Sequence, residues 1–243
     1  MTELPESRPV AVVTGGNTGI GKAVSQALAD AGYLVAICFG TDEAGAQALA
    51  SELRGCAIPV DVTSEQSVQN AALRVLREFG TPQVLVNNAG IQERVPFVEL
   101  TVEQFDRMMA VNTRGAFLMT KALVPAMMEA QRGKIINISS QTALVGRSEM
   151  VHYTASKGAL IAMTKSLARE LAPYGILVNC VAPGPVTSGP ALASAAERSA
   201  YASSLPLQRF ATPEEVADTV RFLAVGGEYY TGQVLSPNGG EVM

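Results

Sequence analysis

The chain carries little charge and few of the residues that bind metals or form disulfides. Only 16% of its 243 residues are charged, its net charge is −4, and it contains one histidine and no tryptophan. A slightly acidic chain gives no sign of the basic surface that binds nucleic acid. Its apolar runs are far shorter than a bilayer requires, so we expect neither a nucleic-acid partner nor a membrane span.

The three cysteines, Cys38, Cys56 and Cys180, are far apart in the sequence, and each lies within an apolar run. An odd number without regular spacing predicts neither a disulfide framework nor a metal site. We interpret them as buried thiols in a reducing compartment. The first nine residues contain two acids and two prolines, without the cationic and apolar segments of a secretion signal. A cytoplasmic location is therefore expected.

Hydrophobic residues make up 48% of the chain, which is enough for a full core. Short apolar runs, predicted to be strands, alternate with amphipathic stretches. These runs are 10–13, 34–39, 57–62, 84–86, 134–138, 176–182 and 233–236. Strands that are apolar throughout and alternate with helices are typical of a parallel sheet covered on both faces. No linker interrupts the pattern, so residues 1–243 are predicted to form one doubly wound α/β domain with a mostly parallel seven-stranded sheet.

Several helix starts can be read from the sequence. Thr63 and Thr101 are each followed three residues later by glutamine, the spacing of a capping box. The second predicts a long helical region that reaches about residue 130. Residues 212–215, Thr-Pro-Glu-Glu, combine a cap, a proline at the first position and a glutamate at the third.

A glycine-rich turn follows the first predicted strand and precedes an amphipathic helix. It contains Gly15, Gly19 and Gly21. Small residues at such a turn allow backbone N–H groups and a helix N-terminus to approach a pyrophosphate closely. This placement favours a dinucleotide site over a tight turn without a ligand.

Polar residues also follow other predicted strands, at the edge of the sheet where ligands of this fold class bind. Asp61 could accept a hydrogen bond from an adenine amino group, or it could be a helix-capping or turn aspartate. The Asn-Asn-Ala-Gly segment at 87–90 could tie neighbouring strands together or line a cofactor. Asn112 could produce a kink that holds a water molecule, or lie on an exposed helix face.

Tyr153 and Lys157 are four residues apart, so on a helix both side chains point from the same face. A phenol normally loses its proton near pH ~10, which is too high for proton transfer at neutral pH. A nearby ammonium group would stabilise the phenolate and lower that pKa. The pair could therefore be a general acid/base unit, although the same spacing also occurs on exposed helix faces.

In combination, these motifs resemble those of the compact, single-domain short-chain dehydrogenase/reductase family. In chain order they are T-G-x-x-x-G-x-G at 14–21, N-N-A-G at 87–90, Asn112, Ser140, Y-x-x-x-K at 153–157 and the turn Pro183-Gly184. Ser140 is preferred to Ser139 because it precedes the tyrosine by the family's usual interval of thirteen residues. The resemblance covers about residues 9–240, and it implies a Rossmann fold and an NAD(P)-dependent oxidoreductase that interconverts a carbonyl and a secondary alcohol.

The resemblance also implies a role for each of four catalytic residues. Tyr153 would exchange a proton with the substrate oxygen while the nicotinamide exchanges a hydride with the carbon. Ser140 would hold that oxygen by a hydrogen bond. Lys157 would lower the tyrosine pKa and anchor the nicotinamide ribose, and Asn112 would hold a water that links Lys157 to solvent.

Sixteen residues are expected, by the same resemblance, to contact the cofactor. They are Gly15, Asn17, Thr18, Gly19, Ile20, Thr41, Asp61, Val62, Asn88, Ala89, Gly90, Tyr153, Lys157, Pro183, Gly184 and Val186.

NADP(H) is favoured over NAD(H) as the cofactor. Relatives that prefer NAD place an aspartate at the end of the second strand, and Phe39 occupies this position here. Asn17 and Thr41 could contact a 2′-phosphate. NAD(H) stays open, because the positions at which many NADPH-preferring members carry an arginine hold Thr18 and Gly40.

The substrate is less well defined. Residues 186–210 are rich in small side chains and have no strong pattern, and in the family this segment is a mobile lid over the substrate. A pocket wall is expected from residues 144–145 and 150–152, where His152 is interpreted as a wall or surface residue. Many relatives reduce 3-oxoacyl groups on acyl carrier protein, an acidic partner that exposed arginines would dock. Arg132 and Arg169 lie near the expected docking positions, but a small free ketone or alcohol is favoured.

Two competing classes remain as alternatives. A dinucleotide-binding regulator without turnover would not need the complete set of four catalytic residues. A sugar-nucleotide epimerase or dehydratase shares the Y-x-x-x-K unit, but such enzymes usually carry a longer C-terminal substrate domain. The resemblance further implies a homotetramer, assembled through two long helices and the C-terminal segment. The alanine- and methionine-rich faces at 116–128 and 159–171 are consistent with burial between subunits, or equally with internal packing.

Overall fold

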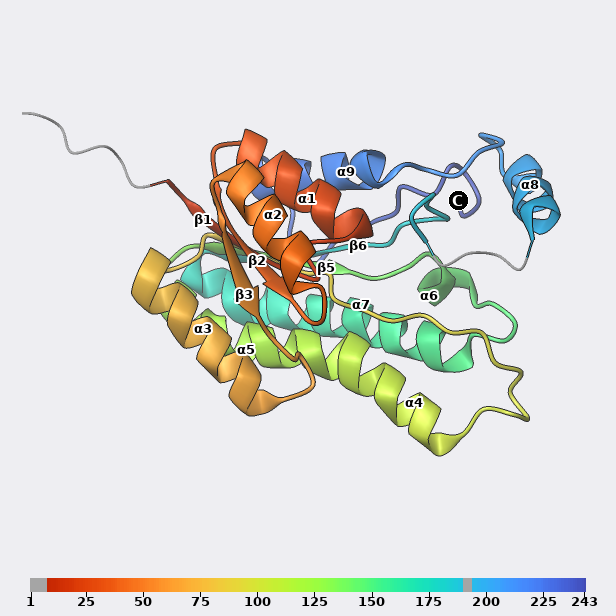
Figure 1. Ribbon diagram of the computed structural model, residues 1–243, viewed down its shortest axis with the longest axis horizontal. Coiled ribbons are helices and arrows are strands. Elements are labelled where there is room, and N and C mark those ends of the chain that lie inside the picture. Colours follow the sequence, from red (N-terminus) through yellow and green to blue (C-terminus); the bar gives the residue numbers. More distant parts are fainter. Residues whose placement is uncertain (1–7, 190–193) are drawn as a thin grey trace, which may run out of the picture.

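The computed structural model describes residues 8–189 and 194–243. Seven parallel strands form one sheet in the order β3-β2-β1-β4-β5-β6-β7 (Figure 1). The strands are β1 Val10–Thr14, β2 Leu34–Phe39, β3 Cys56–Pro59, β4 Val84–Asn87, β5 Gly133–Ile138, β6 Ile176–Val181 and β7 Val234–Leu235. Every residue of β1 and β4 is buried, as expected for strands covered on both faces. The predicted doubly wound fold is confirmed.

Helices cover both faces of this sheet (Figure 1). On one face, α1 Gly19–Asp30, α2 Glu43–Leu53 and α9 Pro213–Val225 share a core with the sheet. On the other, α3 Glu65–Phe79, α5 Gly115–Glu129 and α7 Val151–Leu171 enclose a second core. The remaining helical elements are α4 Val102–Met109, the π-helical turn η1 Ala110–Arg114, α6 Thr142–Val145, the 3₁₀ turn η2 Ala172–Tyr174 and α8 Ala195–Ser204.

The strand order reverses between β1 and β4, which pair directly with each other. From β1 the chain proceeds outward through β2 to β3, and from β4 it proceeds in the opposite direction through β5 to β7. The loops that leave the carboxyl ends of β1 and β4 therefore diverge and open a crevice, the usual ligand site of such sheets.

The predicted capping boxes at Thr101 and Thr212 are confirmed, since each side chain accepts from the backbone of the third helical residue. The one predicted at Thr63 is wrong. Its hydroxyl and backbone N–H both donate to Asp61, at 2.7 and 2.8 Å, so Ser64 caps α3 instead. The third strand also ends earlier than predicted, at Pro59.

The long helical region after Thr101 is interrupted by the π-helical turn η1, which contains Asn112. A side chain bonded outside its own helix explains the break, because Asn112 bonds the backbone of Ile91 in both directions, at 2.8 and 2.9 Å. The predicted local distortion is therefore present, and its cause lies twenty-one residues earlier in the chain.

Among the described residues, no helix combines the length and apolar character needed to cross a membrane. The same part of the chain holds no cluster of three or more metal-ligating side chains. Cys38 and Cys180 are buried, Cys56 is partly buried, and all three are free thiols.

Leu28 on α1 is fully buried in the core shared with α9. Truncation to alanine should lower the free energy of unfolding by about 2–5 kcal/mol, because the cavity left behind cannot close fully. Urea denaturation measures this loss. Leu73→Ala is the matched control, since that side chain is 63% exposed and should cost less than about 0.5 kcal/mol. Equal losses in the two variants would contradict the described core.

Candidate active site

The crevice is a cleft of about 290 Å³ formed by loops from four strand ends. It is lined by residues that follow β1, β4, β5 and β6, together with two side chains of α7. These are Gly15, Thr18, Gly19, Ile20, Asn88, Ala89, Gly90, Ile91, Gln92, Ile138, Ser139, Ser140, Tyr153, Lys157, Pro183, Val186, Ser188 and Gly189. We call it the main cleft.

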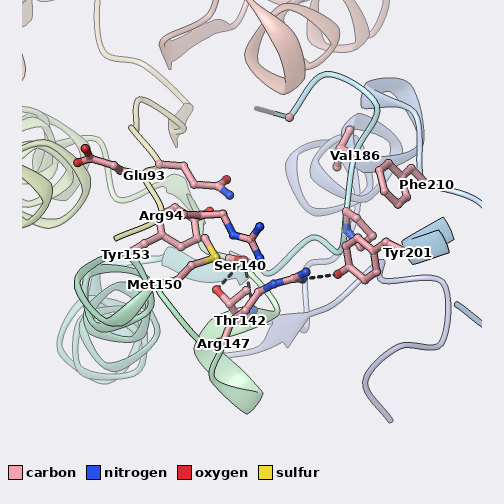
Figure 2. Close-up of a pocket in the computed structure, with 13 residues that line it drawn as sticks. Glu93, Arg94, Ser140, Thr142, Arg147, Met150, Tyr153, Val186, Tyr201 and Phe210 are labelled. Atoms are coloured by element: carbon pink, nitrogen blue, oxygen red, sulfur yellow. Dashed lines mark hydrogen bonds between the residues drawn. The ribbon is translucent and has the colours of Figure 1, made fainter. Parts of the chain in front are cut away.

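A second space of about 290 Å³, which we call the side cavity, is shown in Figure 2. The two are lined in common by Gln92, Ser140, Tyr153, Val186 and Gly189. The two predicted catalytic hydroxyl groups, on Ser140 and Tyr153, thus belong to side chains that line both spaces.

Tyr153 and Lys157 lie one turn apart on the α7 face that packs against the sheet. The ammonium of Lys157 is 5.9 Å from the ring centroid of Tyr153 and donates to the carbonyl of Ile138 at 2.8 Å. Only 5% of Lys157 is exposed. The predicted pair is therefore brought together in the cleft and is not on an exposed helix face.

Burial raises the pKa of Tyr153 above its ordinary value, and a hydrogen bond with Ser140 lowers it. The Lys157 ammonium donates to a backbone carbonyl, and the expected lowering of the tyrosine pKa by Lys157 stays a prediction. Burial also lowers the pKa of Lys157 to about 8. At neutral pH the site therefore holds a protonated phenol beside a lysine that is still mostly charged.

Ser140 and Ser139 differ in what their hydroxyl groups do. The Ser139 hydroxyl donates to the carbonyl of Lys157 at 2.7 Å, so its proton is used in a bond to the backbone of α7. Ser140 Oγ instead accepts from the hydroxyl and N–H of Thr142, at 3.0 and 3.2 Å. Its hydroxyl is also hydrogen-bonded to the phenol of Tyr153, and this bond lowers the tyrosine pKa. A bond from Ser140 to a substrate oxygen stays a prediction.

Asn112 is almost fully buried, so its alternative reading as an exposed helix residue is wrong. Besides its two bonds to Ile91, its amide donates to the hydroxyl of Ser156 at 3.0 Å. It thereby ties the loop after β4 to α7. Gly90 lies beneath it, where an added Cβ would approach Asn112 and the ammonium of Lys157 to 3.2 and 3.3 Å.

The start of α1 fits an anion. Its N-cap, Thr18, makes no side-chain cap bond, and no acidic residue occupies the first turn. The first N–H groups and the positive end of the helix dipole therefore face the main cleft without a built-in partner. Gly15 and Gly19 adopt φ of +60° and +50°, which disfavours side chains on this wall. Asn88 holds the turn by donating to the carbonyls of Thr14 and Gly15.

Eleven of the sixteen expected cofactor residues line the main cleft, and five do not: Asn17, Thr41, Asp61, Val62 and Gly184. Asp61 accepts from Thr63, and those bonds lower its pKa, so its turn-forming alternative is realised. Val62 is buried against α5, and Asn17 donates to the carbonyl of Asp42 at 3.2 Å. Contact of all sixteen residues with a cofactor stays a prediction.

The segment at 87–90 was expected either to tie neighbouring strands together or to line a cofactor site, and Asn87 and Asn88 differ in this respect. Asn87 is buried and its amide donates to Thr120 and Asn137, at 3.0 and 2.9 Å, so it ties β4 to α5 and β5. Asn88 lines the main cleft.

Of the expected substrate-pocket wall, Met150 lines the side cavity. Leu144, Val145 and Val151 are exposed and do not line it. His152 is fully buried, with its Nε2 3.9 Å from the carboxylate of Glu93, so it is a core residue rather than a surface one.

The side cavity also contains residues that the sequence patterns did not single out. They are Gln92, Glu93, Arg94, Thr142, Arg147 and Tyr201. Tyr201 belongs to α8, within the segment 186–210 for which no pattern was expected; residues 190–193 of that segment lie outside the described residues. A signal was available, because Ser194 and Glu197 have capping-box spacing and form that box.

Comparison with known proteins decides the family. The family model for "short chain dehydrogenase" matches residues 9–199. The chain belongs to this family. A short-chain dehydrogenase is an oxidoreductase, and the family binds nicotinamide cofactors, so the class expected from the motifs is confirmed.

Curated relatives match the dehydrogenase over nearly its full length. It is 38% identical over 246 residues to 3-oxoacyl-[acyl-carrier-protein] reductase FabG of Aquifex aeolicus, covering 98% of this chain and 99% of the relative. It is 36% identical over 241 residues to 3-oxoacyl-[acyl-carrier-protein] reductase of Synechocystis, covering 96% and 97%. The crystal structure of gox2181 superposes with a TM-score of 0.89 at 32% identity, covering 96% of this chain and 95% of that one.

The buried ammonium of Lys157 should make stability depend on pH. Its pKa is about 8 in the folded chain against an ordinary 10.5, so between these values the unfolded chain binds more protons. The free energy of unfolding should therefore rise with pH across this window, by about 3 kcal/mol from this group.

Denaturation of the cofactor-free protein at pH 7–10.5, beside Lys157→Met, measures this contribution. Since the other titrating groups are shared by both proteins, their effects cancel in the difference between the two curves. Parallel curves would show that Lys157 is not a buried cation.

Proposed function

We propose that the dehydrogenase transfers a hydride between NAD(P) and a small ketone or secondary alcohol, with Tyr153 as the general acid/base. The observation that carries this proposal is that Ser140 and Tyr153 line both the main cleft and the side cavity. A cofactor in the first space and a substrate in the second would meet at these two hydroxyl groups.

In the direction of reduction, Tyr153 donates its proton to the carbonyl oxygen of the substrate. When bound, the nicotinamide supplies the hydride that reduces the carbonyl carbon. Ser140 donates a hydrogen bond to the same oxygen as negative charge develops on it. One hydride and one proton convert the carbonyl to an alcohol, and in oxidation Tyr153 takes the proton back. The raised pKa of Tyr153 keeps it protonated at neutral pH, as an acid must be.

Lys157 and Asn112 complete the proposed set. The Lys157 ammonium, charged at neutral pH, favours the phenolate that remains after proton donation. It would also bond a ribose hydroxyl at the main cleft. Asn112 fixes the loop after β4 against α7, and we assign it the water that returns a proton from solvent by way of Lys157.

The eleven expected cofactor residues that line the main cleft would hold the cofactor, with its pyrophosphate at the start of α1. We favour NADP(H), with NAD(H) as the alternative. Phe39 at the end of β2 is an apolar, buried side chain, so it offers no carboxylate to repel a 2′-phosphate. Asn17 and Thr41 would lie toward that phosphate.

Fluorescence titration should therefore give a lower Kd for NADPH than for NADH, and the reverse order would overturn this preference.

Reduction of 3-oxoacyl groups on acyl carrier protein is a second candidate, because the relatives named above carry that activity in their names. The positions of the two arginines considered for docking acyl carrier protein do not support this activity. Arg132 directly precedes β5, at the sheet edge opposite the side cavity. Arg169 lies sixteen residues after Tyr153 on α7, about 24 Å along the helix. Neither arginine lies beside the cavity of its own subunit, so we favour a free small molecule.

We infer that residues 186–210 contribute one wall of the substrate space. Val186, Gly189, Tyr201 and Phe210, all from the described part of this segment, line the side cavity. A regulator without turnover would have no use for such a cavity beside a complete Ser/Tyr/Lys set.

Self-association, expected as a homotetramer, is supported by exposed apolar side chains around α4 and α5. They include Phe97, Val102, Phe105 and Phe117.

The free thiols suit a cytoplasmic location.

Tyr153→Phe should lower kcat by about 10²–10⁴-fold, because the ring remains but the proton donor is lost. Nicotinamide absorbance with a panel of ketones and alcohols, run with NADPH and NADH in turn, measures the effect. Cofactor affinity should be unchanged.

Tyr229→Phe removes a hydroxyl from a fully exposed tyrosine and should leave turnover at the wild-type rate. Undiminished turnover in Tyr153→Phe would remove this residue from the mechanism. No turnover by the wild type with any carbonyl or alcohol would favour the regulator instead.

A further inference from the structure

The side cavity carries positive charge next to the proposed reaction centre. Arg94, from the loop after β4, and Arg147, between α6 and α7, line it together with Ser140 and Tyr153. Figure 2 shows both arginine side chains extending into the cavity. Glu93 contributes to the wall, but its carboxylate lies 3.9 Å from the buried His152 and points away from the cavity in Figure 2.

Arg147 is held in place without a carboxylate of its own. Its Nη1 donates to the hydroxyl of Tyr201 at 2.6 Å, and its guanidinium lies 4.4 Å from the centroid of the same ring. Tyr201 in turn donates to the carboxylate of Glu241 at 2.8 Å. Within residues 8–189 and 194–243, no carboxylate oxygen lies within 4 Å of the Arg147 guanidinium. Its position is thus fixed by a neutral phenol, and in the described ranges its other guanidinium N–H groups have no acceptor.

Arg94 is only weakly compensated. Its closest carboxylate is Glu149, at 3.9 Å, and both side chains are nearly half exposed. A contact of that length between exposed groups contributes little, so it would give way to a better acceptor. The described part of the chain therefore presents two guanidinium groups to one cavity, Arg147 without a carboxylate partner and Arg94 with a single long contact to Glu149.

The chemistry of these groups selects the ligand. Guanidinium is a planar fork whose paired N–H groups match the two oxygens of a carboxylate, and it stays charged at any working pH. The remaining wall includes apolar groups, from Met150, Val186 and Phe210. A volume of about 290 Å³ suits a molecule of few carbon atoms.

We propose that the substrate is a small oxo acid, or the matching hydroxy acid, whose carboxylate binds Arg147 and Arg94 while its carbonyl faces Ser140 and Tyr153. This inference rests on the proposed oxidoreductase function and names the substrate class for the same site. The reaction is unchanged in its balance, since the carboxylate neither gains nor loses atoms. Arg147 and Arg94 determine specificity, and Tyr201 is a positioning residue that orients Arg147.

The test compares each acid with its own neutral ester. Kinetics are measured with 3-oxobutanoate and 4-oxopentanoate, which vary the spacing between carbonyl and carboxylate, and with their methyl esters. At least one acid should be reduced with a higher kcat/KM than its ester. Arg147→Gln should lower kcat/KM for that acid by about 10- to 100-fold, chiefly through KM, because a hydrogen bond to a charged group is lost. The ester should be affected far less.

Two further variants keep the test decisive. Arg94→Gln should produce the same acid-selective loss without touching the contact to Tyr201. Arg198→Gln is the matched control, since Arg198 stacks on Phe210 at 5.1 Å but does not line the cavity, and it should leave the acid-to-ester ratio unchanged.

The possible results separate this inference from the proposed function. Equal losses for acid and ester in Arg147→Gln would show a purely structural arginine and overturn the inference. Preference for the esters, or for dihydroxyacetone phosphate over both acids, would overturn the carboxylate assignment while leaving the oxidoreductase proposal intact. Absence of turnover with any carbonyl compound would instead reject the proposed function.

Discussion

Three buried hydrogen bonds fasten α7 to the end of β5, and the proposed reaction centre depends on them. The amide of Asn137 donates to Thr164 at 2.8 Å, the hydroxyl of Ser139 donates to the carbonyl of Lys157 at 2.7 Å, and the Lys157 ammonium donates to Ile138. Because polar groups this deeply buried are costly to leave unpaired, the helix can neither rotate nor slide without a large loss. The face that carries Tyr153 is thereby held against the carboxyl end of the sheet.

The loop after β4 is held by a second set of side-chain bonds. Asn88 ties it to the glycine turn, and Asn112 ties it to α7. Asn112 lies in the π-helical turn η1, and its amide donates to both Ile91 and Ser156. One distorted turn therefore connects the wall of the main cleft to the helix that carries the proposed acid.

The main cleft and the side cavity differ in the source of their positive charge. The main cleft offers glycines and the positive end of α1, which suit phosphates without a charged side chain at the turn. The side cavity offers two guanidinium groups held by neutral or distant partners. Lys157 lines the main cleft alone, and its ammonium donates to the backbone of β5. Cationic groups thus lie on the walls of both spaces that the partly buried Tyr153 lines, an arrangement that suits the proposed reaction and an anionic substrate.

The sequence alone determined what depends on neighbours within a few residues. Apolar runs predicted the parallel sheet, threonine and glutamine spacing predicted the start of α4, and the four-residue interval between Tyr153 and Lys157 predicted one helix face. These succeed because helix and strand geometry is set by local hydrogen bonds and burial. The Thr63 cap failed because Asp61, two residues away, offered a charged acceptor.

Only the tertiary structure decided which distant segments meet. Arg94, Arg147 and Tyr201 come from three separate connections, and no local pattern relates a residue to one more than fifty positions away. The partner of Asn112 and the direction of the Lys157 ammonium were hidden for the same reason. Their positions follow from the order in which the strands pair, which fixes the loops at one edge of the sheet, and that order is a property of the packed chain.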